Sequence, residues 1–332
     1  MVRSRPVTSA QAALPAVGRD QRFHHGSRRD FLAIVAGAAL AAPALAKSNE
    51  PQAQFPTSPR DRLAVTSYPF RAYIESPANR GRKADVPGMD LTRFPALMVE
   101  KFGVHNVNPL VDHFRSTDAS YIEEFRKALA DAHSRIVDLG LPGRPFYSPE
   151  KTVRQAAVEA GRKWIDIAVA VGSPSVRQHV HGARNQKADV DLAGESLGEL
   201  AEYGAKRNVV VNLENDDPVS EDPFFLVGVI EKVGNPYLRG LPDFGNSLIG
   251  HDQEFNERGV AAMLKHAFNM CHVKDVVQGD SGKTYHVDLK RMFELAKSSS
   301  YRGYFSMECE TESTDPFTGT KRLVDESLKY LT

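Results

Sequence analysis

The sequence predicts an α/β fold, a single-domain (β/α)8 TIM barrel over residues 61–332. β-branched and apolar runs alternate eight times with segments of helical period, and strands that alternate with helices form parallel sheets. The 272 residues of this range suit a barrel of about 250 residues. The competing fold, an open doubly wound sheet, favours a G-x-G-x-x-G turn, and the sequence contains none.

The first four units lie between residues 61 and 207. Strands are expected at residues 63–68, 104–108, 135–139 and 175–179, the last of which carries the weakest β pattern. A long polar loop, residues 71–90, separates the first strand from its helix. Helices are expected at residues 92–102, 119–133, 149–171 and 191–207, where apolar residues recur on one face.

The last four units carry the clearest strand of the chain, residues 208–214, which contains three consecutive valines. The remaining strands are expected at residues 238–243, 270–274 and 304–310, and the helices at residues 222–233, 255–266, 287–297 and 323–331. Cys271 and Cys309, the two cysteines, fall in strands, where we expect them to face the helices as free thiols.

Residues 1–46 have the layout of a bacterial twin-arginine signal peptide. Residues 27–32 (SRRDFL) open an apolar run, and Ala44-Leu45-Ala46 closes it with a cleavage pattern. The run is shorter than the about 20 residues that span a bilayer, so cleavage after Ala46 is favoured over a membrane anchor. We therefore expect a periplasmic or secreted protein with no stable membrane insertion after signal removal. Residues 47–60, rich in Pro, Gln and Ser, predict a disordered leader.

The charge balance excludes one class of partner. Lys plus Arg and Asp plus Glu number 42 each, so no positive excess indicates binding to nucleic acid. The sequence leaves open whether the chain forms a homo-oligomer.

Four polar residues lie at or near the ends of the last four predicted strands: Glu214, Asp243, His272 and Glu308. Their separations of 29, 29 and 36 residues equal about one βα unit each, which places them side by side at the C-terminal rim of the barrel. Three carboxylates would repel one another without a cation. Together with one imidazole they suit a single divalent metal ion, Mn²⁺ first, with Mg²⁺, Co²⁺ or Zn²⁺ as alternatives.

The segments that carry these residues resemble the xylose isomerase-like barrel superfamily, in particular its sugar phosphate isomerase/epimerase branch. They read NLEN at residues 212–215, DFGN at 243–246, HVKD at 272–275 and SME at 306–308. The resemblance covers residues 61–331. It implies that Glu214, Asp243, His272 and Glu308 hold one metal ion, and that Glu214 and Glu308 are also the catalytic acid/base pair. The implied enzyme is a metal-dependent isomerase or epimerase, which abstracts a proton next to a carbonyl or hydroxyl carbon of a small carbohydrate.

Two positions differ from the free-ketose 3-epimerases of this superfamily. Asn246 stands where they have a histidine, and Gln278 where they have an arginine. Two alternatives therefore stay open. One is a lyase or hydrolase that cleaves oxidised (3-keto) glycosides by β-elimination, and the other is a non-catalytic sugar-binding barrel.

Five further residues are candidates for substrate contact. Lys274 shares the inward face of its strand with His272, and Arg177 and His179 share a face near the end of the fourth strand. Asn246 follows Asp243 by three residues, and Asn108 ends the second strand. Glu310 alternates with Glu308 and is the rival ligand if the strand register shifts by two.

Overall fold

The computed structural model describes residues 50–279, 282–310 and 315–332. The export signal predicted at residues 1–46 lies outside the described residues, so the cleavage site and the periplasmic location stay predictions. No helix in the described ranges combines the length and the apolar character needed to cross a bilayer.

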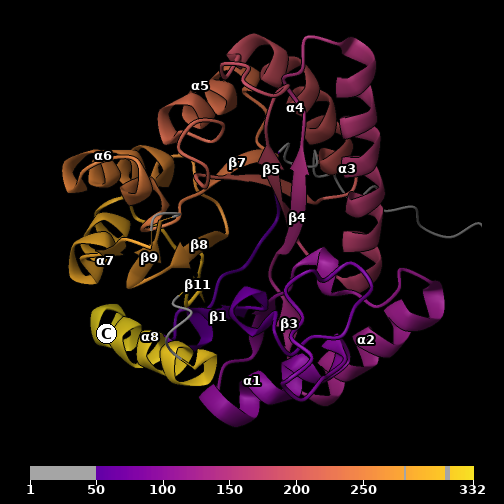
Figure 1. Cartoon of the computed structure of the whole chain (residues 1–332), viewed down its shortest axis with the longest axis vertical. Helices are drawn as coiled ribbons and strands as arrows, with labels where there is room; N and C mark the ends of the chain where they lie inside the picture. The colour runs from indigo at the N-terminus through magenta and orange to yellow at the C-terminus, as the bar shows by residue number, and fades with distance from the viewer. Residues whose placement is uncertain (1–49, 280–281, 311–314) are drawn as a thin grey trace, which may run out of the picture. The chain divides into compact units, whose positions relative to one another are not determined.

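The strands form a closed parallel barrel surrounded by helices (Figure 1). One run of hydrogen-bonded strands has the order β3-β2-β1-β11-β8, and the other has the order β4-β5-β6-β7. Isolated parallel bridges join the two runs. Leu110 pairs with Gly140 on one side, and Gly240 with Ala267 and Asp243 with His272 on the other. These pairings confirm the predicted (β/α)8 barrel.

The strands are β1 (Leu63–Thr66), β2 (Asn106–Asn108), β3 (Arg135–Ile136), β4 (Leu139–Arg144), β5 (Ser175–Val180), β6 (Val210–Glu214), β7 (Leu238–Leu241), β8 (Met270–Val273), β9 (Val276–Gln278), β10 (Thr284–His286) and β11 (Tyr304–Met307). The α-helices are α1 (Phe94–Phe102), α2 (Ala119–Asp131), α3 (Lys151–Val171), α4 (Val190–Ala205), α5 (Pro223–Val233), α6 (Gln253–Leu264), α7 (Leu289–Ser298) and α8 (Pro316–Leu331).

Local sequence sets the ends of these helices. The five helices from α4 to α8 each begin after an aspartate whose side chain accepts a backbone N–H of the first turn. Helices α1, α3 and α5 end at Gly103, Gly172 and Gly234, which adopt positive φ angles that other residues rarely tolerate. Because these residues define where each helix begins or ends, they also define where the loops to the barrel strands begin and end.

Three elements differ from the sequence prediction. The third strand is divided into β3 and β4, because Asp138 leaves the ladder and its side chain is bonded inside the barrel. An antiparallel hairpin, β9 with β10, follows β8 where a loop was expected. Helix α8 begins at Pro316 rather than at residue 323, since Asp315 caps it and proline is favourable in the first turn.

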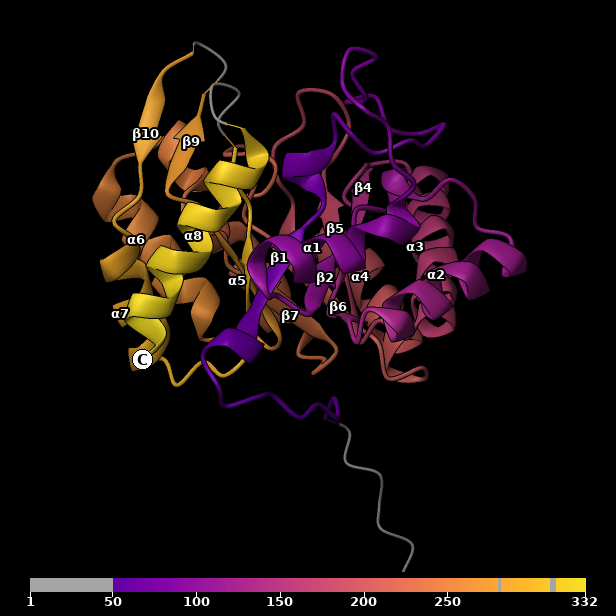
Figure 2. The same ribbon diagram turned by 90° about the horizontal axis from the view of Figure 1, so that it is seen from below.

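The prediction of a disordered leader is wrong for residues 50–60, the part of it that the structure describes. Phe55 packs edge-on against Phe268 and Tyr304, with ring centroids 5.5 and 5.9 Å apart, and Glu50 forms a 2.9 Å ion pair with Arg239. This segment lies at the end of the barrel opposite the β9–β10 hairpin (Figure 2). Apolar contacts and one ion pair therefore hold a stretch that composition alone marks as polar.

Two apolar regions stabilise the barrel. The larger lies between the strands and the surrounding helices, and Cys271 and Cys309 both belong to it as buried side chains. The smaller lies inside the barrel at its N-terminal end and consists of Ala64, Val137, Leu241, Met270 and Tyr304. Phe55 packs against this smaller cluster from outside.

Candidate functional site

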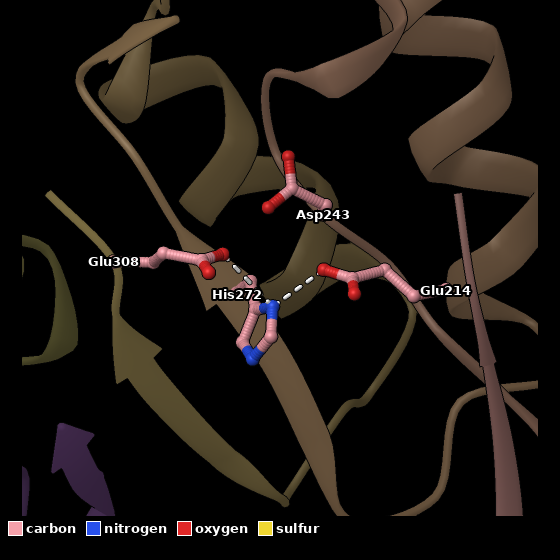
Figure 3. A group of neighbouring side chains, drawn as sticks. All are labelled: Glu214, Asp243, His272 and Glu308. Carbon is pink, nitrogen blue, oxygen red and sulfur yellow. Dashed lines mark hydrogen bonds and ion pairs between the residues drawn. The ribbon is translucent and has the colours of Figure 1, made fainter. Parts of the chain in front are cut away.

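The structure brings the four predicted ligands together at the C-terminal end of the barrel (Figure 3). One potential ligand atom from each of Glu214, Asp243, His272 and Glu308 lies within 4.8 Å of the others, and all four residues are buried. Glu214 ends β6, His272 lies in β8, Asp243 lies two residues after the end of β7, and Glu308 directly follows β11. The spacing of one βα unit therefore places the four groups on neighbouring strands, as predicted.

Glu214 and Glu308 approach His272 from two sides (Figure 3). The Nδ1 atom of His272 lies 2.5 Å from Glu214 Oε1 and 3.1 Å from Glu308 Oε2. Burial opposes a charge on this ring, but the two carboxylates outweigh it and raise the pKa of His272 to about 10. Burial likewise opposes ionisation of Glu214, whereas His272 and Arg177 lower its pKa to about 2.

The hydrogen bonds of the Asp243 carboxylate indicate whether a divalent cation fits this cluster. Its Oδ1 accepts the backbone N–H groups of Gly245 and Asn246 at 2.9 and 2.8 Å, whereas its buried Oδ2 has no hydrogen-bond partner in the described part of the chain. Burial raises the pKa of this carboxyl to about 7, although the Lys274 ammonium, 3.4 Å from Oδ2, opposes the rise. An oxygen in this state gains most from a divalent cation, so the donor set fits one.

A cavity of about 230 Å³ opens beside the cluster, and it is smaller than the pockets typical of drug-sized ligands. Glu214 and Glu308 line it, together with four of the five residues predicted to contact substrate: Lys274, Asn246, Arg177 and His179. Asn108 does not line this cavity. It is fully buried beneath the cluster, and its Oδ1 lies 2.8 Å from Nε2 of His272, so it contacts a ligand residue instead of the substrate cavity.

The two cations of the cavity are each held by carboxylates. Arg177 Nη1 donates to Glu214 Oε2 at 2.7 Å and contacts His179. Lys274 donates to Asn246 Oδ1 at 2.7 Å and forms a short ion pair with Glu310. Glu310, the rival ligand, is therefore engaged by Lys274, and the register that places Glu308 in the cluster is the observed one.

Two carboxylates near the cavity have no counterpart among the predicted site residues. Glu221 is buried, accepts the backbone N–H of Val180 at 2.6 Å, and lies 3.1 Å from Nδ1 of His179. Asp216 lies 3.7 Å from the other ring nitrogen of His179. Both follow β6 in an irregular loop, where no strand or helix period marks a direction in the sequence. With His179 they form a second group in which one potential ligand atom from each residue lies within 4.8 Å of the others.

Asn215 supports the cluster from behind. Its Oδ1 accepts the backbone N–H of Asp243 at 2.8 Å, and its amide donates to the Asp243 carbonyl at 3.1 Å. This pair of bonds joins the ends of β6 and β7 and fixes the backbone of one ligand residue relative to the strand of another.

Comparison with known proteins agrees with this architecture. Residues 98–332 match the family model described as xylose isomerase-like TIM barrel. The L-ribulose-5-phosphate 3-epimerase of Shigella flexneri serotype 5b is 27% identical over 180 residues, which cover 52% of this chain. The match spans 62% of that relative's length.

Solved structures share the fold at low sequence identity. A xylose isomerase-like TIM barrel protein from Mycobacterium smegmatis in complex with magnesium has a TM-score of 0.61 and 20% identity, and the match covers 82% of this chain and 96% of that chain. D-allulose 3-epimerase from Methylomonas sp. in complex with D-allulose has a TM-score of 0.59 and 16% identity, with 83% and 97% covered. Since the family model matches more than half of the sequence, this chain belongs to the xylose isomerase-like TIM barrel family.

Proposed function

We propose that this protein is a sugar isomerase or epimerase that depends on one divalent metal ion, Mn²⁺ as the first choice. The observation that carries the proposal is the placement of Glu214 and Glu308 on two sides of His272, where both line one small cavity. The sugar epimerases among its relatives and structural neighbours support the same reaction class.

Glu214, Asp243, His272 and Glu308 would hold the ion. When bound there, a divalent ion polarises a carbonyl or hydroxyl oxygen of the substrate and stabilises the negative charge that develops on it. The buried Oδ2 of Asp243, which no hydrogen bond satisfies in the described part of the chain, supports this assignment.

Glu214 and Glu308 are proposed as the acid/base pair. One carboxylate accepts the proton from the carbon beside the carbonyl, and either glutamate, once it carries a proton, returns one to that carbon or to its neighbour. The low pKa of Glu214, held down by His272 and Arg177 against the effect of burial, keeps this group ionised and able to accept. A positioned acid or base of this kind contributes about 10²–10⁴-fold to the rate.

The cavity favours an uncharged sugar over a sugar phosphate. Its lining includes five carboxylates, those of Asp112, Glu214, Asp216, Glu308 and Glu310, against the two cations Arg177 and Lys274. Both cations are already paired with carboxylates, so neither is available to balance the charge of a phosphate. The proposed substrate is a free keto or aldo sugar whose hydroxyl groups bind to Lys274, Asn246, Arg177 and His179.

Proton exchange with solvent tests the reaction class. The protein, supplied with Mn²⁺, is incubated in D₂O with a panel of free sugars, sugar phosphates and 3-keto glycosides. Deuterium at a carbon beside the carbonyl of a recovered, uncleaved sugar supports the proposal. Release of an aglycone from a 3-keto glycoside would contradict the proposed isomerase and support the lyase instead. Sugar binding without exchange in any member of the panel would favour the non-catalytic barrel.

We also propose that the protein is exported. The twin-arginine pattern of residues 27–32 and the cleavage pattern at residues 44–46 support this location. Cell fractionation of the full chain tests it: Arg28→Lys with Arg29→Lys should shift the protein from the periplasm to the cytoplasm, and an unchanged distribution would contradict export by this route.

A further inference from the structure

A buried carboxylate lies inside the barrel, one layer below the four proposed ligands. Asp138 is completely buried at the break between β3 and β4. Its bonds come from neutral donors, with Ser175 Oγ at 2.5 Å and Asn212 Nδ2 at 3.0 Å on Oδ1. Bulky apolar side chains commonly fill barrel interiors, and a buried carboxylate costs several kcal/mol before its bonds are counted. This cost suggests that the carboxylate of Asp138 has a function inside the barrel.

The third bond of Asp138 leads to the site. Asn108 donates its Nδ2 to the backbone carbonyl oxygen of Asp138 at 3.1 Å and to the carboxylate Oδ2 at 3.2 Å. Both partners are acceptors, so the hydrogen-bond network itself determines which end of the amide carries the nitrogen. Oδ1 of Asn108 therefore faces the opposite way, 2.8 Å from Nε2 of His272.

An amide oxygen only accepts, so Nε2 of His272 must carry a hydrogen. The ring then presents its other nitrogen, Nδ1, to Glu214 and Glu308. This is the orientation in which a neutral histidine offers a lone pair to an ion at the cluster. Histidines that bind metals generally donate their second N–H to a fixed acceptor, which sets both the tautomer and the angle of the ring.

We propose that Asn108 and Asp138 are positioning residues, which hold His272 with a hydrogen on Nε2 and keep Nδ1 free for the metal ion. Hydrogen bonds connect Asp138 through Asn108 to His272. The carboxylate therefore also increases the electron density of the imidazole ring through the polarised amide. This inference rests on the proposed metal site. It gives a function to a carboxylate that contributes nothing else evident to the cavity.

Metal affinity provides the first test. Asn108→Leu removes the acceptor for Nε2 at nearly constant volume, and Mn²⁺ should bind about 10–100-fold more weakly by titration calorimetry. Asn106→Leu is the matched control. Asn106 lies two residues earlier in β2 on the same face and is also buried, and within the described residues its amide donates to the carbonyls of Asp61 and Leu63. This control should lower the unfolding temperature and leave the Mn²⁺ dissociation constant unchanged.

A charge swap provides the rescue. Asn108→Asp alone places two carboxylates side by side and should bind Mn²⁺ poorly. The double variant Asn108→Asp with Asp138→Asn again offers an acceptor to Nε2 and a donor behind it, and should recover most of the wild-type affinity. If Asn108→Leu does not fold, Asp138→Asn, which keeps the shape of the layer, should still weaken Mn²⁺ binding, though by less.

A readout without metal separates this inference from the proposed function. In ¹⁵N-histidine spectra of the metal-free protein, assigned with His272→Gln, the Nε2–H signal of His272 should be protected from exchange in wild type and in Asn106→Leu, and lost in Asn108→Leu. Equal Mn²⁺ affinity of wild type and Asn108→Leu would leave the metal site standing and overturn the positioning role. A wild-type protein that binds no divalent ion, yet shows the protected Nε2–H, would overturn the metal site while leaving the hydrogen bond established.

Discussion

The two ends of the barrel interior differ sharply in chemistry although the same strands form both. At the N-terminal end, the interior holds the apolar cluster that Phe55 covers. At the C-terminal end it holds the four proposed ligands. On β8, Met270 belongs to the first group and His272 to the second. Leu241, which ends β7, and Asp243 divide in the same way. Because alternate residues share a face, a step of two residues along one strand passes from packing to chemistry.

The comparison indicates that stability and catalysis depend on different depths of one structure. The polar layer of Asp138, Ser175, Asn212 and Asn108 separates the two ends and connects to His272. Variants at the N-terminal end should therefore change the free energy of unfolding, and variants at the C-terminal end should change metal binding or turnover.

The largest effect is expected at the C-terminal end. Glu308→Gln should lower the rate of proton exchange into the sugar by about 10²–10⁴-fold, because the amide cannot accept or return the proton. The free energy of unfolding should change far less. Single-turnover exchange in D₂O at saturating Mn²⁺ measures the first quantity and denaturant titration the second. A variant that keeps the wild-type exchange rate would remove Glu308 from the acid/base pair.

Leu241→Ala should show the reverse behaviour. Leu241 is fully buried in the apolar cluster, and such truncations cost about 2–5 kcal/mol of the free energy of unfolding. Asp243→Asn, two residues along the chain, is its partner in the comparison and should lose Mn²⁺ binding. Urea denaturation and Mn²⁺ titration of both proteins check the pair. Loss of Mn²⁺ affinity in folded Leu241→Ala would break the separation of the two ends.

Acid should destabilise the C-terminal end through His113. Burial, with a smaller contribution from Arg71, lowers the pKa of this histidine to about 4, and Ser67 Oγ lies 2.7 Å from its Nδ1. The unfolded chain binds this proton below its ordinary pKa of 6.5, so stability is complete above that pH and falls as the pH drops toward 4. The lost stability amounts to about 3 kcal/mol.

His113→Asn removes this titration while keeping a polar side chain that can accept the Ser67 hydroxyl. The slope of unfolding free energy against pH between 6.5 and 4 should become shallower than in wild type. Denaturant titrations at several pH values measure it, and identical slopes would show that His113 is not held neutral in the folded protein.

The smallest effect is expected for Phe55. Its ring is only partly buried against Phe268 and Tyr304, so Phe55→Ala should cost about 1–2 kcal/mol, below the 3–5 kcal/mol typical of a fully buried phenylalanine. Exchange activity should not change. Thermal and urea unfolding give the comparison, and a loss of activity without loss of stability would contradict a purely structural role for this end of the barrel.

Much of the site could be predicted from the sequence, because the repeated βα unit converts spacing into position. Glu214, Asp243, His272 and Glu308 are separated by about one unit each, so their proximity follows from the fold class alone. The position of Lys274 in the lining of the cavity follows from strand alternation in the same way.

Other features depend on contacts that periodicity does not encode. The sequence predicts that Asn108 contacts the substrate, yet its side chain lies deep inside the barrel and contacts His272 instead. Asp138 interrupts a strand that the β-branched pattern predicts as continuous, because three strands supply donors to its carboxylate. Glu221 lies in a loop, and residues 50–60 depend on Phe268 and Tyr304, which are distant in the sequence.

Metal content tests the central claim most directly. The purified wild-type protein, loaded with Mn²⁺ and freed of excess, should carry one divalent ion per chain by elemental analysis, and Asp243→Asn and His272→Gln should each lose it while remaining folded. A wild-type protein that retains no divalent ion, or full occupancy in both folded variants, would contradict a metal site built from Glu214, Asp243, His272 and Glu308.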